Sequence, residues 1–403
     1  MSISSATMRK FIPEEPDRYV FAASWFQNEA QERKLYLYFY PNDCSLELFD
    51  LRTRKTFLRR CKVQGIAESD LYLGAKLMIY GRQIDVTDYA DELTRRRLSA
   101  KRQKTFLVVK PTAFQCTGKI ITILYQQKFT VQQLKMVRID QGLAQIIFDD
   151  VDISGNPIEP YDLFTVEIKQ FLIYFDFSFL VDQLTQGPCV MMELSGDDAV
   201  SRLINLIGEH GDPQAKPPSR LLFGLDSLRT AVFVSKNLQQ AETHIKTFFG
   251  DYSPKVTAQE KNTTLCLIKA HAIKEGNAGK IIDGLFDADF RITAMKMCLL
   301  ERQNCEEFYE VYKGVVPEYV QMVLQLSSGP CIALEVLGKT DNSNSYSEFR
   351  GICGPADPEI AKQIRPHTLR AKFGVNKVEN AVHCTDLEED CQLEVEYFFK
   401  IIE

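Results

Sequence analysis

The stretch Asn380-Ala-Val-His383-Cys-Thr385-Asp386 holds the residues of this 403-residue chain that are best suited to chemistry. It places one imidazole among amide, hydroxyl and carboxyl groups. A neutral imidazole can attack an electrophile through one ring nitrogen if an acceptor holds the N–H on the other side. A histidine taken alone is more often a structural residue. His383 is therefore a candidate nucleophile only if the chain also supplies cations and an acceptor around it.

The composition excludes several classes of protein. Hydrophobic residues make up 45% and charged residues 25% of the chain, as in globular proteins, and its length predicts two to three domains. No apolar run is long enough to span a membrane, and residues 1–11 lack the apolar core of a signal peptide, so we expect a soluble cytosolic protein. The 11 cysteines form no C-x-x-C pair and there are only 5 histidines, which favours reduced, mostly buried thiols and no metal site in the protein. A net charge of −6 argues against nucleic-acid binding.

The charge is unevenly distributed along the chain. Residues 1–104 hold 19 Lys and Arg against 14 Asp and Glu, and the remainder holds 29 against 40. A basic front on an acidic body suggests an N-terminal contact with an acidic surface, although so small a surplus is often only a solvated face. Residues 96–104 include most of the run Arg95-Arg-Arg97 and further basic residues. We interpret them as a basic linker in preference to a nuclear or nucleic-acid signal.

Two parts of the chain repeat each other. Thr105–Ala113 resembles Thr264–Ala272, and each stretch is followed by Gly-Lys-Ile-Ile. Further matches follow in the same order, pairing 186–193 with 328–335, 220–224 with 370–374, 230–233 with 380–383 and 248–249 with 398–399. This pattern predicts two copies of one domain, 105–250 and 263–403, joined by a linker at 251–262. Their equivalent apolar faces should pack together as an intrachain pseudo-dimer.

Each copy alternates apolar β-type runs with apolar residues at helical spacing. We expect strands at 106–109, 134–137 and 189–194, with counterparts at 265–268, 294–297 and 331–336. Helices should bury Ile120, Ile121 and Leu124, and in the second copy Ile281, Ile282 and Leu285. This alternation predicts an α/β sandwich with helices on one face of each sheet.

Residues 1–95 read as a separate small β domain. Leu35–Tyr40 and Ser45–Phe49 are two strand-like runs separated by the turn Pro41-Asn-Asp43. The stripe of Tyr36, Tyr38 and Tyr40 is interpreted as one face of this domain.

The histidine stretch resembles the Asn-x-x-His-x-Ser-Asp pattern of nucleoside diphosphate kinases, and Lys269 stands where that family has a Lys-Pro-Asp motif. The front domain resembles the DM-10 module of axonemal proteins in five short stretches, 17–21, 24–26, 39–41, 55–58 and 81–83. The resemblance implies a multi-domain chain: a small N-terminal β (DM-10, PH-like) domain followed by two α/β ferredoxin-like nucleoside diphosphate kinase domains. This order is similar to that of the flagellar members of the family, which are microtubule inner proteins of ciliary doublets.

The resemblance also implies a chemistry. In this family a histidine takes the γ-phosphoryl group of a nucleoside triphosphate and passes it to a diphosphate, with Mg²⁺ on the phosphates. It assigns catalytic roles to His383, Glu394 and Lys269, and nucleotide-binding roles to Tyr309, Arg350, Arg370, Asn380 and Thr385.

Some positions depart from the family pattern. Ala270-His271 replaces the Pro-Asp after the lysine, Ala356 replaces a phosphate-contacting threonine, and Val315–Pro317 replace a base-stacking phenylalanine. Loss of the aromatic ring predicts weaker nucleotide binding, since base stacking contributes roughly 1–3 kcal/mol. The remaining histidines, His210, His244, His271 and His367, are given surface or structural roles.

The first repeat departs further and is interpreted as an inactive scaffold. Lys110 and Arg220 persist. The positions of the nucleophile, asparagine, glutamate and first arginine are occupied by Phe233, Thr230, His244 and Ile204.

Two functions remain open and do not exclude each other. The first is a structural role in the lumen of ciliary or flagellar doublet microtubules, with tubulin and neighbouring inner proteins as partners. The second is nucleoside diphosphate kinase activity of the second repeat near the axoneme, with nucleotides as substrates. Neither function calls for a membrane or a nucleic acid. The expected location is the cytoplasm, and within it the cytoskeleton of the cilium.

Overall fold

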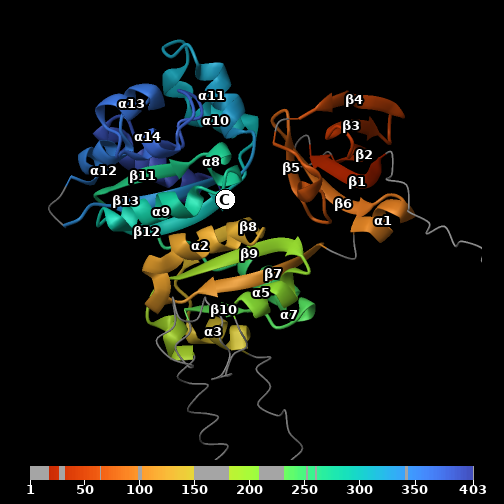
Figure 1. Cartoon of the computed structure of the whole chain (residues 1–403), viewed down its shortest axis with the longest axis horizontal. Coiled ribbons are helices and arrows are strands. Elements are labelled where there is room, and N and C mark those ends of the chain that lie inside the picture. Colours follow the sequence, from red (N-terminus) through yellow and green to blue (C-terminus); the bar gives the residue numbers. More distant parts are fainter. Residues whose placement is uncertain are drawn as a thin grey trace, which may run out of the picture. The chain divides into compact units, whose positions relative to one another are not determined.

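The computed structural model describes residues 18–26, 32–63, 65–98, 102–148, 181–207, 231–250, 253–258, 261–340 and 344–402. The chain divides into two compact units, residues 1–100 and 101–403, which are described separately here (Figure 1). His210, Arg220 and Thr230 lie outside the described residues.

The N-terminal unit is an antiparallel sheet of six strands in the order β4-β3-β2-β1-β6-β5. Its elements are β1 Tyr19–Phe26, β2 Glu32–Tyr40, β3 Ser45–Asp50, β4 Lys55–Lys62, the 3₁₀ turn η1 Glu68–Asp70, β5 Lys76–Ile79, β6 Arg82–Tyr89 and the helix α1 Glu92–Leu98. The expected hairpin is confirmed, because β2 and β3 pair antiparallel on either side of the 41–44 turn.

Strand β2 shows why this sheet forms. Its alternate residues Leu35, Leu37 and Phe39 are fully buried in the core of the unit. The tyrosines between them lie on the opposite face, partly exposed, where the guanidinium of Arg18 lies 4.5 Å from the ring centre of Tyr38 and that of Arg60 lies 3.6 Å from that of Tyr40. The tyrosine stripe is thus one face of a β domain, as expected. The assignment of this N-terminal unit to the DM-10 module stays a prediction.

The second unit holds both repeats in one antiparallel sheet of eight strands, in the order β10-β7-β9-β8-β12-β13-β11-β14. The first repeat supplies β7 Arg102–Val109, β8 Thr130–Val137, β9 Cys189–Asp197 and β10 Val232–Val234. The second supplies β11 Thr263–Ile268, β12 Arg291–Cys298, β13 Cys331–Leu337 and β14 Val382–Cys384. Each half has the strand order of a ferredoxin-like fold, and this order runs in opposite directions in the two halves of the sheet. All six predicted strands are confirmed.

Helices cover both faces of this sheet, so the expectation of helices on one face was wrong. One cluster contains Leu107 and Val109 of β7 with residues of α2 Thr117–Gln126 and α5 Ala199–Ile207. The intervening Phe106 and Val108 belong to a cluster on the opposite face with α3 Gln141–Phe148 and α7 Leu238–Phe249. A strand buried on both faces is apolar throughout instead of alternating, and β13 is such a strand.

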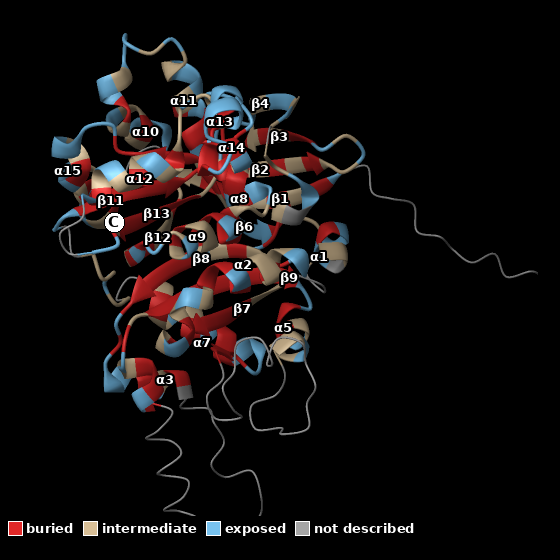
Figure 2. Cartoon of the chain, turned by 60° about the vertical axis from the view of Figure 1, so that its left-hand side comes forward, coloured by how far each residue is buried: buried red, intermediate tan, exposed pale blue. Residues whose placement is uncertain are grey.

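The second repeat repeats this two-sided cover (Figure 2). Its helices are α8 Ala270–Lys274, α9 Ala278–Asp287, α10 Arg302–Phe308, α11 Tyr319–Leu326, α12 Ser345–Cys353, α13 Pro358–Ile364, α14 Leu369–Phe373 and α15 Cys391–Glu396. Its 3₁₀ turns are η3 Glu310–Tyr312 and η4 Glu388–Asp390, and η5 Tyr397–Ile401 is π-helical. In the first repeat η2 Pro111–Cys116 precedes α2. The helix predicted at the Gly-Lys-Ile-Ile stretch of each repeat is confirmed as α2 in the first and α9 in the second, with the expected residues buried.

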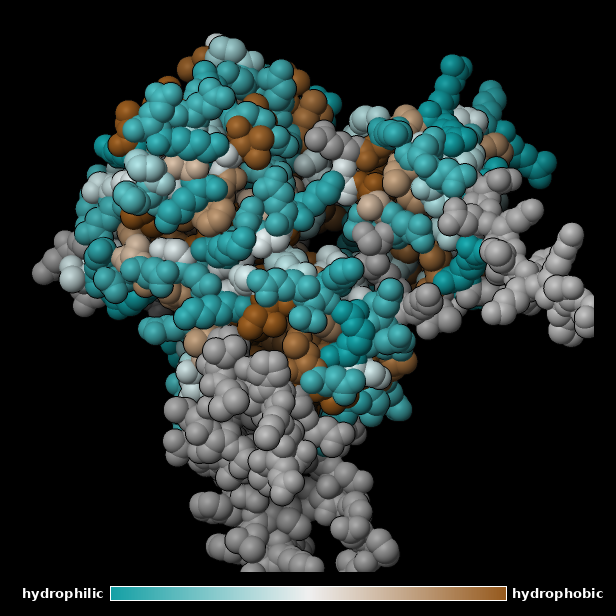
Figure 3. All heavy atoms as spheres, viewed as in Figure 1, coloured by the Kyte–Doolittle hydropathy of each residue, from teal (hydrophilic) through white to brown (hydrophobic). Residues whose placement is uncertain are grey.

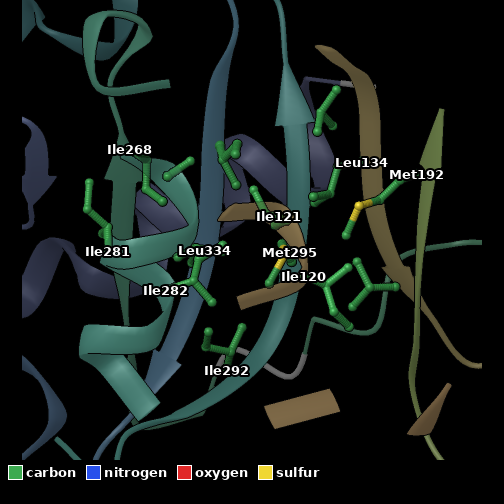
Figure 4. Close-up of a cluster of buried hydrophobic side chains, with 14 of the residues drawn as sticks. Ile120, Ile121, Leu134, Met192, Ile268, Ile281, Ile282, Ile292, Met295 and Leu334 are labelled. Atoms are coloured by element: carbon green, nitrogen blue, oxygen red, sulfur yellow. The ribbon is translucent and has the colours of Figure 1, made fainter. Parts of the chain in front are cut away.

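The repeats join as the predicted pseudo-dimer. Helices α2 and α9 touch at Gly118 and Gly279, where a Cβ on either glycine would overlap the carbonyl oxygen of the other. Strands β8 and β12 pair at Lys135 and Lys296. Side chains of both repeats form one cluster around this junction, and Figure 4 labels ten of them.

Regular structure extends into the segment that the sequence predicted as a linker. Helix α1 ends at Leu98, and β7 begins at Arg102 and pairs with β9 from its first residue. An ion pair also joins β7 to β9 in this segment, because Nζ of Lys104 lies 2.7 Å from Oε1 of the buried Glu193.

Most cysteines are buried, as the sequence predicted. All eleven cysteines are free and eight are buried. In the view of Figure 3 the described surface is mostly hydrophilic, with hydrophobic side chains in separate patches. Among the described helices, none has the length and apolar character to cross a membrane.

The glycine contact between α2 and α9 generates the first prediction. Gly118→Ala should destabilise the second unit by about 1–3 kcal/mol, because the added methyl group overlaps Gly279 and forces the helices apart. Gly351→Ala is the matched control, since Gly351 lies inside α12 with nothing within 4 Å of an added Cβ. That control should gain about 0.5–1 kcal/mol. Urea unfolding of both variants measures the difference, and equal stability of the two would contradict the contact.

Candidate active site in the second repeat

A strained turn places His383 on the edge strand of the sheet. Strand β14 pairs with β11, and His383 lies opposite Leu267. Ala381, just before the strand, has φ +69°, in the left-handed region. The N–H of Val382 donates to the carbonyl oxygen of Asn380 (2.9 Å), which closes a γ-turn of the rare form with positive φ. Strain of this kind clusters at functional sites.

Glu394 holds one nitrogen of the His383 ring. Its Oε2 lies 3.0 Å from Nε2 of His383 and also accepts a hydrogen bond from Oγ1 of Thr385 (2.7 Å). A carboxylate facing Nε2 places the imidazole proton there, which leaves the lone pair on Nδ1 as the nucleophile. Phe308 and Tyr309 pack against the ring, with centroids 5.1 Å and 6.0 Å away. His383, Glu394 and Thr385 thus meet as the sequence predicted.

Lys269 brings a buried positive charge to the site. It follows the last residue of β11 and is the N-cap residue of α8. Its Nζ donates to the carbonyl oxygen of Val378 (2.9 Å) and, within the described part of the chain, to no carboxylate. Burial, followed by the charge of Arg370, lowers the pKa of Lys269 to about 7. An anion bound here would favour the protonated amine.

The two arginines are held in place by backbone carbonyls. Arg370 of α14 donates from Nε to Val382 (3.2 Å) and from Nη1 to Gly354 (3.0 Å). Its Nη2 also lies 3.5 Å from Sγ of Cys384, whose pKa is lowered by a hydrogen bond from the Cys353 thiol and by the charge of Arg370. Arg370 is therefore fixed next to the strand that carries His383.

Arg350 of α12 forms a different contact. Its Nη1 donates to Oδ1 of Asp386 (2.6 Å) and to the carbonyl oxygen of Thr385 (2.9 Å). Burial raises the pKa of Asp386, but hydrogen bonds from Tyr312 and Arg350 outweigh it and hold that pKa below its usual value. An anion that takes up Arg350 has to compete with this carboxylate.

Two buried polar atoms in the site lack a partner among the described residues. Asn380 donates from Nδ2 to the carbonyl oxygen of Ala356 (3.1 Å), while its Oδ1 has no hydrogen bond. The hydroxyl of Tyr309, a fully buried side chain, also has none. Buried polar groups are nearly always paired, so both atoms mark places for a ligand or water.

The structure adds residues that sequence reasoning missed. Asp386 stood in the motif without a role, and it organises Arg350 and Tyr312. His271, given a surface or structural role, accepts the N–H of Ala381 at Nε2 (3.2 Å), beside the site. No pattern in the sequence signals this contact, because the two residues lie 110 positions apart.

The departures from the family pattern are also visible. Ala356 contributes only its carbonyl oxygen, to Asn380. Val315, in the segment expected to stack on a base, is 76% exposed. An aliphatic side chain at this place offers no ring for stacking.

The equivalent place in the first repeat contains no nucleophile. Phe233 of β10 is fully buried, on the opposite edge of the sheet from His383. His244 lies 2.9 Å from Oγ of Ser235 through Nδ1, and its ring packs near Phe233 with centroids 5.6 Å apart. His244 is therefore an interior structural residue, and Lys110 contacts Oε1 of Gln183 (3.0 Å). Phenylalanine cannot form a phosphoramidate, and the inactivity of the first repeat stays a prediction.

Comparisons with known proteins agree with the repeat. The family model for nucleoside diphosphate kinase matches residues 169–253 and 262–403. Nucleoside diphosphate kinase homolog 7 of Rattus norvegicus is 41% identical over 397 residues, which cover 96% of this chain and 94% of that protein, and its counterpart in Mus musculus has the same values. Nucleoside diphosphate kinase of Aquifex aeolicus (strain VF5) is 34% identical over 140 residues, 35% of this chain and 95% of that protein.

The lowered pKa of Lys269 generates a prediction about stability and pH. Between about pH 7 and pH 10.5 the unfolded lysine holds its proton while the folded one has lost it. The unfolded state then binds more protons, so Lys269 makes the free energy of unfolding rise with pH in this window. Urea unfolding at pH 7 and pH 9.5 should show a larger rise for the wild type than for Lys269→Met. The two chains share the other buried lysines, so an equal rise in both would contradict the lowered pKa.

Proposed function

The chain belongs to the nucleoside diphosphate kinase family, and we propose that its second repeat binds a nucleoside triphosphate and takes the γ-phosphoryl group on His383. The observation that carries this proposal is the hydrogen bond between Glu394 and Nε2 of His383, which fixes the ring and leaves Nδ1 as the nucleophile. The first repeat lacks such a group and serves as a scaffold.

The residues around His383 fit a nucleotide that carries Mg²⁺, the combination that this family uses. Lys269, Arg350 and Arg370 supply positive charge for phosphates, and Oδ1 of Asn380 is a buried acceptor suited to a ribose hydroxyl. The described residues contain no group of three acidic, histidine or cysteine side chains that could hold a metal, so Mg²⁺ would arrive on the phosphates. The ion supplies neutralisation of phosphate charge.

The proposed step exchanges one bond for another. Nδ1 of His383 forms a bond to the γ-phosphorus, and the bond from that phosphorus to the bridging oxygen breaks, so the nucleoside diphosphate leaves with the electron pair. The proton on Nε2 stays between the ring and Glu394, which stabilises the charge that develops on the imidazole. Transfer to a second diphosphate reverses these events.

A phosphohistidine assay tests this function. Incubation with γ-labelled ATP and Mg²⁺ should give an acid-labile, base-stable label that a nucleoside diphosphate then removes. His383→Ala should abolish the label. Glu394→Gln should slow its formation roughly 10²-fold, because a neutral amide does not stabilise the positive charge that develops on the imidazole. His244→Ala, at the equivalent site of the first repeat, should keep the label.

Each outcome of that assay decides one part of the proposal. A label that survives in His383→Ala would exclude His383 as the acceptor. A wild-type label that no diphosphate removes would contradict turnover while supporting nucleotide binding. No label on the wild type would remove the enzymatic function.

We further propose that the chain has a structural role as a microtubule inner protein of ciliary or flagellar doublets, attached through its N-terminal unit. Tubulin and neighbouring inner proteins would be its partners. Residues 51–67 hold six Lys and Arg and no Asp or Glu, and they include the edge strand β4. Figure 3 shows hydrophilic side chains gathered over this strand. Tubulin surfaces are broadly acidic, so this edge complements them and would steer docking.

Truncation tests the attachment. Removing residues 1–100 should abolish incorporation into axonemal doublets and leave the second unit folded, since that unit has its own core. Exposed ion pairs contribute only about 0.2–1 kcal/mol each, so moderate salt should not release the full chain from doublets. Fractionation of salt-washed axonemes measures both effects. Normal incorporation of the truncated chain would assign attachment to the kinase-like repeats.

A further inference from the structure

The segment from Lys269 to His271 holds the strained residue Ala381 at both of its backbone polar groups. The N–H of Lys269 donates to the carbonyl oxygen of Ala381 (2.9 Å), and Nε2 of His271 accepts the N–H of Ala381 (3.2 Å). Ala381 is the centre of the γ-turn, with Asn380 on one side and His383 two residues beyond on the other. These two contacts therefore act on the turn that orients the nucleophile.

The contact to Ala381 specifies the charge and tautomer of His271. An imidazole nitrogen that accepts an N–H has no proton of its own, so the ring must be neutral with its proton on Nδ1. Nδ1 lies 3.0 Å from the amide nitrogen Nε2 of Gln325 on α11. Two donors cannot face each other, so the Nδ1–H tautomer requires the Gln325 amide to be turned by 180°, with Oε1 in place of Nε2. This orientation also gives Oε1, a buried atom otherwise without a partner among the described residues, its hydrogen bond.

The surroundings of His271 keep it neutral. Burial is the main cause and the ammonium of Lys269 the second, and together they lower its pKa to about 4. Glu379, in the segment before β14, opposes this shift through both its charge and its backbone, but less strongly, and Gln325 on α11 is uncharged. A protonated His271 would present an N–H to the N–H of Ala381 and lose the contact.

We propose that His271 is a positioning residue for the His383 site: its neutral imidazole accepts the Ala381 N–H and stabilises the γ-turn that orients Asn380 and His383. The inference rests on the proposed nucleotide site. His271 stands where the family pattern has an aspartate, so this chain uses a neutral acceptor in place of a charged one. A neutral acceptor adds no negative charge beside the ammonium of Lys269, so that charge is available to a phosphate.

Two variants of similar size separate the hydrogen bond from packing. His271→Gln keeps an acceptor at the end of the side chain, and His271→Leu removes it. Labelling of His383 by γ-labelled ATP should fall about 10- to 100-fold in the leucine variant, because small displacements of reacting groups cost about this much, and should stay within about threefold in the glutamine variant. His367→Leu, the same change at an exposed histidine, should have no effect. Equal loss in the glutamine and leucine variants would overturn the proposal.

A measurement on the wild type keeps the proposal testable if the leucine variant fails to fold or if no label forms. Nitrogen NMR of the full chain with labelled histidine should show His271 with its proton on Nδ1 and unprotonated Nε2 from pH 8 down to about pH 5. The Ala381 amide proton should shift upfield in His271→Leu and not in His271→Gln. An Nε2–H tautomer or an imidazolium at pH 7 would overturn the proposal. Absence of label with the expected tautomer would contradict only the enzymatic function.

Discussion

The close approach of α2 and α9 at Gly118 and Gly279 is the contact on which the architecture of the second unit depends. Two backbones can approach this closely only where neither residue has a side chain. The approach brings β8 next to β12, joins two four-stranded halves into one sheet and merges their interiors into one cluster. It also leaves β10 and β14 at opposite edges, so the two equivalent sites share a core and do not contact each other.

This separation allows the two sites to differ while the fold stays the same. In the first repeat the nucleophile position is occupied by a buried phenyl ring, which costs no desolvation of charge and packs against His244. His244 and Phe248 both pack against Phe106. In the second repeat the same position has an imidazole, a facing carboxylate, a buried ammonium and a turn at positive φ. Each of these destabilises a folded chain unless a partner compensates. Their joint presence in one repeat argues for a retained function there.

Most of the buried polar groups at this site are paired with neutral partners, not with opposite charges. Lys269 and Arg370 are satisfied mainly by backbone carbonyls, and Ala381 is held by a neutral histidine. A phosphate entering this region would meet positive charge on Lys269 and Arg370, which form no ion pair among the described residues, and on Arg350, which pairs with Asp386. The proposed attachment would use another unit, whose basic edge is formed by β4, so the two proposed functions would place separate demands on the sequence.

Much of this was determined by the sequence alone. The collinear repeat indicated two related copies of one fold, the apolar runs located all six predicted strands, and the Asn380–Asp386 stretch with Glu394 identified residues that meet at the site. These features are local, or repeat in register, and so can be seen in one dimension. The continuous apolar runs are themselves typical of strands buried on both faces, but only the tertiary structure showed which helices cover each face, because an apolar run does not specify what packs against it. The tertiary structure also decided the roles of His271, Asp386 and the paired glycines, because each depends on a partner more than 30 residues away, and proximity across that separation is set by packing.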